Sequence, residues 1–185
     1  ISEDDTKKEK FKNIIELLTP VSKAYTTFKG IDVTSSGIQV FGGYGFIEEY
    51  PQAQFYRDVR ISSIYEGTNG IQAMDLLGRK LGMKTGKPVM DLMNEIQKTV
   101  KKAENIGLED MGAKLSQLLS KAGESAASIG GAASGENILD AFGSASLFLE
   151  SVGDLCMAWA HAERASTAAD KIKNAGKKDK AFYQG

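Results

Sequence analysis

The amino-acid sequence predicts an all-α protein with two helical regions. Apolar residues recur at three- and four-residue intervals along most of the chain, which is the spacing of a buried helix face. No run of alternating β-branched residues indicates a strand. The chain has 185 residues, of which 42% are hydrophobic, so it is long enough to bury a core. It contains only 3 prolines, so few positions interrupt a helix.

The first region begins with a helix that is predicted over about residues 7–28. Pro20 lies within this helix and predicts a kink or a break there. We expect Gly30 to end the helix and Asp32 or Thr34 to cap the next one. The predicted buried face consists of Phe11, Ile14, Ile15, Leu18, Val21, Tyr25 and Phe28.

Glycine is concentrated in the rest of this region. Residues 30–86 hold half of the 20 glycines, and the run Gly-Gly-Tyr-Gly at 42–45 indicates a helix end that leads into a tight turn. A helix is predicted from about Glu49 or Pro51 to Ile64. Thr68 is then placed to cap a further helix that reaches Leu81.

The stretch Lys-Thr-Gly-Lys-Pro at 84–88 is typical of a linker, and we place a domain boundary there, between residues 1–86 and 87–185. The second domain is predicted to be a bundle or hairpin stack of three amphipathic helices. The Lys-rich stretch 171–180 is interpreted as a solvated helix end. The three stripes are Val89, Leu92, Met93, Ile96, Val100 and Ala103; Leu108, Met111, Leu115, Leu118, Ala122 and Ile129; and Ile138, Phe142, Ala145, Leu149, Val152, Cys156 and Trp159.

Composition excludes several classes of function. The 23 Lys and Arg residues are balanced by 24 Asp and Glu residues, which argues against a nucleic-acid-binding protein. The single cysteine, Cys156, permits no internal disulfide and lies in an apolar stripe as a small core residue. The single histidine, His161, is interpreted as structural or exposed. One cysteine and one histidine are too few ligands for a zinc site, so we expect no metal. The longest apolar stretch, Leu155–Ala160, is too short to cross a membrane.

The ends of the chain predict a truncated, cytoplasmic protein. The sequence starts with Ile1 rather than Met and ends in Ala-Phe-Tyr-Gln-Gly, a run typical of a helix that continues. We therefore expect a fragment of a longer protein. The charged residues that follow Ile1 show no signal peptide, and nothing indicates an oxidising compartment, so a cytoplasmic location is expected.

Glu66 is the candidate catalytic residue. It directly precedes Gly67 and Thr68 at a predicted helix start, where backbone N–H groups are unpaired. The alternative is structural, because acidic residues favour helix N-termini through the helix dipole. The glycine run at 42–45 gives only weak support for phosphate binding, and no strand precedes it, so a Rossmann site is excluded.

Two motifs together give a specific resemblance. The segments Gln39-Val40-Phe41-Gly42-Gly43-Tyr44-Gly45-Phe46 and Tyr65-Glu66-Gly67-Thr68, with Glu-Tyr-Pro and Arg-Asp between them, resemble the C-terminal helical domain of acyl-CoA dehydrogenases over about residues 7–82. Residues 87–185 resemble, more loosely, the additional helical region of longer bacterial members, including the methylmercaptopropionyl-CoA dehydrogenase-like branch. The resemblance implies a helical bundle followed by a second helical bundle region.

The resemblance also implies a role for each site residue. Glu66 stands where the family has its catalytic base, which removes the α-proton of an acyl-CoA thioester while a hydride passes from Cβ to FAD. Tyr65 and Gly67 stand at substrate-facing positions. Gln39, Gly42 and Gly43 stand at positions that face the ADP part of an FAD held by the neighbouring subunit. Thr68 and Gly70 stand at the other cofactor-facing positions. At residue 70, glycine replaces the glutamine that shorter members often have.

These parallels imply FAD as cofactor, electron-transfer flavoprotein as electron acceptor and a homo-oligomer, either a dimer or a tetramer. The chain lacks the N-terminal helical domain and middle β-domain of the family, so we expect it to be inactive alone. Two alternatives remain at this stage. One is a helical oligomerisation or docking module in which Glu66 is only a helix cap. The other is an acyl-CoA oxidase of the same fold.

Overall fold

Helices form the whole regular structure of the computed structural model, which describes residues 3–133, 138–173 and 175–184; no strand occurs in these ranges. The predicted all-α class is confirmed. A π-helical turn, η1 (Leu76–Lys80), follows α4, and a 3-10 turn, η2 (Met83–Gly86), precedes α5. The α-helices are α1 (Glu3–Phe41), α2 (Gly43–Phe46), α3 (Gln52–Ile61), α4 (Asn69–Asp75), α5 (Lys87–Asn105), α6 (Glu109–Ala133), α7 (Ile138–Gly143), α8 (Ala145–Ile172) and α9 (Lys177–Gln184).

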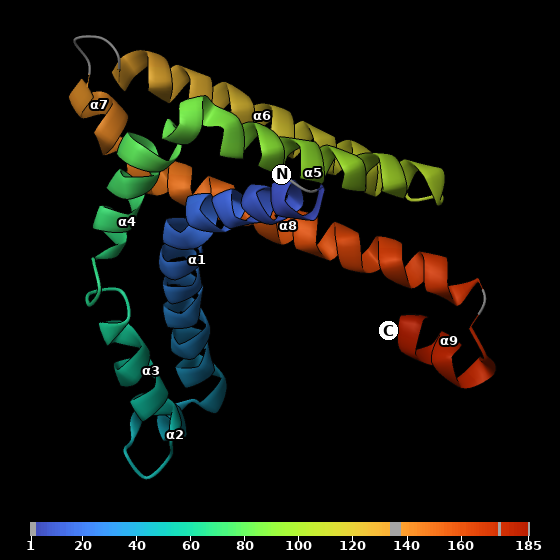
Figure 1. Cartoon of the computed structure of the whole chain (residues 1–185). Helices are drawn as coiled ribbons and strands as arrows, with labels where there is room; N and C mark the ends of the chain where they lie inside the picture. Colours follow the sequence, from blue (N-terminus) through green and yellow to red (C-terminus); the bar gives the residue numbers. More distant parts are fainter. Residues whose placement is uncertain (1–2, 134–137, 174, 185) are drawn as a thin grey trace.

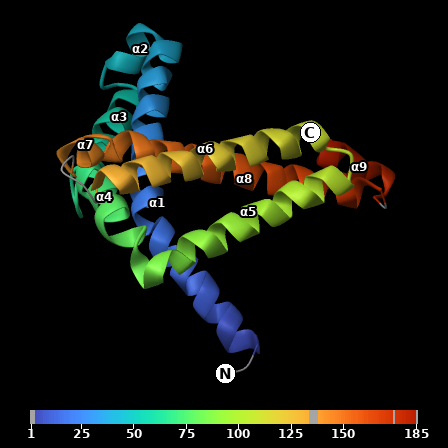
Figure 2. The same cartoon turned by 90° about the horizontal axis from the view of Figure 1, so that it is seen from above.

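The helices form a bundle from which an arm projects. Helices α5, α6 and α8 pack against one another, and α1 packs against α5 and α8. Figures 1 and 2 show the second part of α1 leaving this bundle, with α2 and α3 beside it. We call residues 30–61 the arm. The arm therefore stands away from the second helical region and is held to it by the first part of α1.

Helix α1 is longer than the sequence pattern predicts. It bends along its length (Figure 1), and it passes through the buried Pro20 without the break that the sequence allowed there. The predictions that Gly30 ends the helix and that Asp32 or Thr34 caps the next one are wrong, because α1 continues to Phe41. Packing explains the glycine: a Cβ at Gly30 would lie 2.9 Å from Cγ2 of Val59 on α3.

The end of α1 follows the prediction. Gly42 has φ +60°, a left-handed conformation that ends the helix and starts the short α2. Helix α3 occupies most of the segment predicted between Pro51 and Ile64. Its first residue, Gln52, donates to the carbonyl oxygen of Thr34 at 2.8 Å, which fixes the start of α3 against α1.

One apolar core joins the segments on both sides of residues 84–88. The predicted stripe on α5 is confirmed, whereas on α6 Leu119 is buried and the predicted Leu118 is 43% exposed. The third stripe is divided between α7 and α8, and Ile138 is exposed. The core includes Leu17, Val21, Ala24, Leu76, Leu92, Ile96, Val100, Leu115, Leu119, Phe148, Leu149 and Leu155.

Residues 84–88 form a tight turn that stays close to α1. Lys84 and Thr85 have φ values of +48° and +58°, and Pro88 lies in the first turn of α5. Lys84 Nζ lies 2.9 Å from Oε1 of Glu9 on α1. The hydrogen bond from Lys84 lowers the pKa of Glu9. Further along, the Lys-rich stretch 171–180 forms the end of α8 and the start of α9, and Asn174 lies outside the described residues.

Helices α1 and α8 approach closely at Gly153. A Cβ at Gly153 would lie 2.1 Å from Cδ2 of Tyr25, and the Tyr25 hydroxyl donates to Asp154 Oδ1 at 2.7 Å. Burial raises the pKa of Tyr25 to about 12, with the hydrogen bond to Asp154 acting in the same direction. The glycine therefore makes room for a tyrosine ring that ties α1 to α8.

We predict that Gly153→Ala destabilises the chain, because the Tyr25 ring must move from its place. Overpacking of this kind lowers the free energy of unfolding by about 1–3 kcal/mol. The higher helix propensity of alanine offsets roughly 1 kcal/mol of that loss. Urea unfolding followed by circular dichroism measures the loss. Gly131→Ala on α6 is the matched control, since a Cβ there meets nothing within 4 Å. A Gly153→Ala variant that is as stable as Gly131→Ala would contradict the packing role of Gly153.

Candidate active site

Glu66 lies in a turn that leads into α4. Its φ is +54° and that of Gly67 is +85°, so two successive residues are left-handed. Glycine adopts this conformation readily, whereas for glutamate it carries strain of about 1–3 kcal/mol. The Glu66 side chain is exposed. Thr68 caps α4, as predicted, by accepting a hydrogen bond from the N–H of Ile71 at 3.3 Å.

Helix α1 holds this turn in place. Lys23 Nζ donates to the carbonyl oxygen of Gly67 at 2.7 Å and to Asn69 Oδ1 at 3.3 Å. The hydroxyl of Thr27, one helical turn further along α1, donates to the same Asn69 oxygen at 2.9 Å. From the other side, Gln72 Nε2 donates to the carbonyl oxygen of Glu66 at 3.2 Å. These contacts hold the backbone and leave the carboxylate of Glu66 free to face solvent.

The predicted site residues form two separate groups. Tyr65, Glu66, Gly67, Thr68 and Gly70 surround the start of α4. The other group, at the far end of the arm, consists of Gln39, Gly42 and Gly43. The ten residues of α3 lie between the two groups, which corresponds to about 15 Å along its axis. The structure therefore does not bring all the predicted residues together.

The backbone at the far end of the arm is open. Gly42 and Gly43 are exposed, and a Cβ at either position would meet nothing within 4 Å. The N–H of Gly42 donates to the carbonyl oxygen of Gln39 at 3.1 Å, which closes the turn. These glycines are not needed for packing inside this chain, so their backbone is accessible to a ligand or to another chain.

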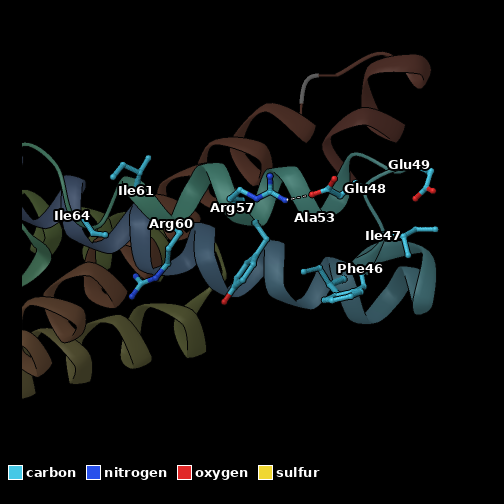
Figure 3. A pocket seen from close by; sticks show the side chains of 11 residues that line it. Phe46, Ile47, Glu48, Glu49, Ala53, Arg57, Arg60, Ile61 and Ile64 are labelled. Carbon is cyan, nitrogen blue, oxygen red and sulfur yellow. Dashed lines mark hydrogen bonds and ion pairs between the residues drawn. The ribbon is translucent and has the colours of Figure 1, made fainter.

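A groove of about 1290 Å³ runs along the arm, and none of the predicted site residues lines it. Figure 3 shows Phe46 and Ile47 toward one end and Ile61 and Ile64 toward the other. Between them, Arg57 lies 3.0 Å from Glu48. The groove is thus a mostly apolar surface with charged residues, and it is suited to contact with another protein surface.

Two family profiles match the chain. Residues 4–81 match the acyl-CoA dehydrogenase C-terminal domain, and residues 92–185 match the family described as acetyl-CoA dehydrogenase C-terminal like. The chain belongs to the acyl-CoA dehydrogenase family. The resemblance inferred from the motifs around Gly42 and Glu66 is thereby confirmed.

Individual acyl-CoA dehydrogenases support the same assignment. The chain is 55% identical over 69 residues (37% of the chain) to the 3-methylmercaptopropionyl-CoA dehydrogenase of Ruegeria pomeroyi, and 41% identical over 93 residues (50%) to a butyryl-CoA dehydrogenase of Syntrophomonas wolfei. It is 31% identical over 177 residues (92%) to a broad-specificity linear acyl-CoA dehydrogenase of Mycobacterium tuberculosis. The chain spans 12%, 15% and 29% of the length of these three relatives, respectively. It therefore corresponds to a C-terminal segment of such an acyl-CoA dehydrogenase.

The single cysteine and the single histidine of this segment both lie on α8, outside the Glu66 turn. In the described ranges, no group of three or more His, Cys, Asp or Glu residues is arranged to hold a metal ion. Burial raises the pKa of the Cys156 thiol to about 11, so this cysteine is a poor nucleophile near neutral pH. His161 is exposed on α8. Among the helices described, none is long and apolar enough to span a membrane.

The sequence pattern identified the turn at Glu66 but not the residues that support it. Lys23 and Gly67 are separated by 44 positions, and Thr27 and Asn69 by 42. No short motif links residues so far apart. The only signal in the sequence is that Lys23 and Thr27 are four residues apart, on one face of a helix and at the edge of its apolar side.

We predict that Lys23→Met loosens the Glu66 turn while the bundle remains folded. A hydrogen bond that involves a charged group contributes about 1.5–3 kcal/mol, so amide exchange at Asn69, whose N–H donates to Ser63, should accelerate about tenfold to a hundredfold. Hydrogen–deuterium exchange measures this rate. Lys29→Met is the control, because Lys29 also lies on α1 but its ion pair, at 4.0 Å, is with Asp154 on α8 and not with the Glu66 turn. Unchanged exchange at Asn69 in Lys23→Met would contradict the anchoring role of Lys23.

Proposed function

We propose that this chain supplies the catalytic base of an FAD-dependent acyl-CoA dehydrogenase, and that the base is Glu66. The observation that carries the proposal is the exposed carboxylate on a left-handed turn, anchored by Lys23, in a chain of this family. The reaction is the α,β-dehydrogenation of an acyl-CoA thioester. The α-proton passes to the Glu66 carboxylate, and the hydride leaves Cβ.

Desolvation would make Glu66 a stronger base. In the chain alone its side chain is exposed, and a carboxylate in water is a weak base. An acyl chain bound over the turn would exclude water and raise the proton affinity of the carboxylate. The backbone N–H of Glu66 or Gly67 would donate to the thioester oxygen as negative charge develops there. Tyr65 and Gly67 would contact the substrate.

FAD, when bound, supplies the acceptor for the hydride. Gln39, Gly42 and Gly43 would contact the ADP part of an FAD held by the neighbouring subunit, and Thr68 and Gly70 would face a flavin at the Glu66 turn. The open backbone at Gly42 and Gly43 fits this role, since neither glycine serves packing within the chain. The separation of the two groups by α3 also fits contact with two different FAD molecules in a homo-oligomer.

The partners follow from the same proposal. The substrate would be an acyl-CoA, and the intact enzyme would be a cytoplasmic dimer or tetramer. The electron acceptor would be electron-transfer flavoprotein, or oxygen in the oxidase alternative. The chain would comprise two family domains, residues 1–86 and 87–185. The two profile matches, which stop at residue 81 and resume at residue 92, support this division.

We predict that Glu66→Gln in the intact enzyme that contains this chain lowers kcat by about 10²–10⁴-fold, because the amide cannot accept the α-proton. FAD should remain bound, as shown by its absorbance. Turnover with an acyl-CoA and an artificial electron acceptor measures the effect. Glu104→Gln, at an exposed position on α5, is the control and should retain wild-type turnover. Normal turnover of Glu66→Gln would contradict the proposed role as base and favour the alternative of a docking module without catalysis.

We also predict that the 185-residue chain alone neither retains FAD nor oxidises acyl-CoA, because the resemblance places most flavin and CoA contacts in domains outside it. Gel filtration of the chain mixed with FAD, followed by the absorbance of the protein peak, tests this prediction. Flavin that co-elutes with the chain at a one-to-one ratio would contradict it.

A further inference from the structure

An apolar cavity of about 270 Å³ lies inside the bundle, where α1, η1, α5, α6 and α8 meet. Its walls include Leu17, Leu76, Ile96, Leu119 and Phe148, each of which is less than 9% exposed. Other lining residues, among them Met93, Ala122 and Ala126, are partly exposed, so the cavity extends from the core toward the surface. It does not include the arm or the turn that carries Glu66.

The lining of the cavity contains no polar side chain. Every residue that borders it is aliphatic, methionine, phenylalanine, alanine or glycine. A water molecule needs two to four polar partners to be stable in a protein interior, and these walls offer none from side chains. A charged or hydrogen-bonding group would lose its hydration without compensation. The cavity thus selects hydrocarbon.

Small residues on α6 leave the space open. Ala122, Gly123 and Ala126 form this wall. A Cβ at Gly123 would lie 3.7 Å from Cε of Met93, which is an ordinary contact. At Gly153, by contrast, a Cβ would collide with the Tyr25 ring at 2.1 Å. Gly123 has no positive φ and no tight neighbour to require it, although glycine is unfavourable within a helix.

The cavity is large enough for a ligand. Engineered apolar cavities of about 150 Å³ stay dry and bind benzene or xenon. The cavity here exceeds that volume, at about 270 Å³. It is also separate from the proposed catalytic turn, because Leu76 follows Asn69 by seven residues, or about 10 Å along α4.

We propose that this cavity is a binding site for a saturated hydrocarbon chain, distinct from the site at Glu66. The occupant is the tail of a free fatty acid or of an acyl thioester, and its polar head remains outside the apolar walls. The π-helical turn η1 contributes Leu76 to the cavity wall, and α4 connects it directly to the Glu66 turn.

Methionine-methyl NMR on the 185-residue chain tests this proposal. Met93 lines the cavity, whereas Met90, on the same helix, is 62% exposed and serves as an internal reference. Titration with n-hexane probes the bare hydrocarbon, and octanoate and octanoyl-CoA distinguish the two sources of the chain. We expect hexane and at least one octanoyl compound to shift the Met93 methyl resonance saturably, with no shift at Met90. An unchanged Met93 resonance with hexane, or equal shifts at Met90 and Met93, would overturn the proposal.

Variants that fill the cavity complete the test. Ala126→Leu should weaken binding at least about tenfold, and Gly123→Ala, which adds a single methyl group, should weaken it less. Gly131→Ala on the same helix should bind as wild type, because a Cβ there meets nothing within 4 Å. Glu66→Gln should also leave the Met93 response unchanged, which separates this site from the proposed catalytic one. Wild-type affinity in both filling variants would overturn the assignment.

Discussion

Burial of the middle of α1 is the constraint on which the rest of the structure depends. Leu17, Val21 and Ala24 are at most 3% exposed in the core shared with α5 and α8. Their burial fixes the rotation of the helix about its axis. Lys23 and Thr27 consequently face the turn before α4, where their hydrogen bonds hold Gly67 and Asn69. The apolar core and the candidate catalytic turn therefore depend on the same helix.

The bend in α1 gives its two parts different neighbours. The first part contributes to the bundle core, and the second part, with α2 and α3, forms the arm (Figure 1). The arm leaves large apolar side chains exposed, among them Val40 at 84% and Phe46 at 78%. Monomeric soluble proteins rarely expose extended apolar patches, so such a surface fits contact with other parts of a larger assembly. The proposed enzyme, in which this segment meets other domains and a second subunit, would provide that contact.

Sequence reasoning was most reliable where structure depends on neighbouring residues. The cap at Thr68, the turn at Gly42 and the buried stripe of α5 follow from local spacing, and the structure has all three. The prediction that Gly30 ends a helix was wrong. A glycine can end a helix, but inside a helix it can also let a second helix approach closely, as α3 does here. The buried position on α6 was misassigned by one residue, from Leu119 to Leu118. An amphipathic helix with a wide apolar face does not reveal from its sequence which edge of that face meets a neighbour.

The sequence by itself determined the helical class and, through two motifs, the acyl-CoA dehydrogenase family and the candidate residue Glu66. These features depend on periodicity and on short runs of residues, which are visible in one dimension. The tertiary structure alone decided that Lys23 anchors the Glu66 turn, that the two groups of predicted site residues are separated by α3, and that an apolar cavity remains in the bundle. Each of these results depends on contacts between residues far apart in the chain, and such contacts are set by how the helices pack.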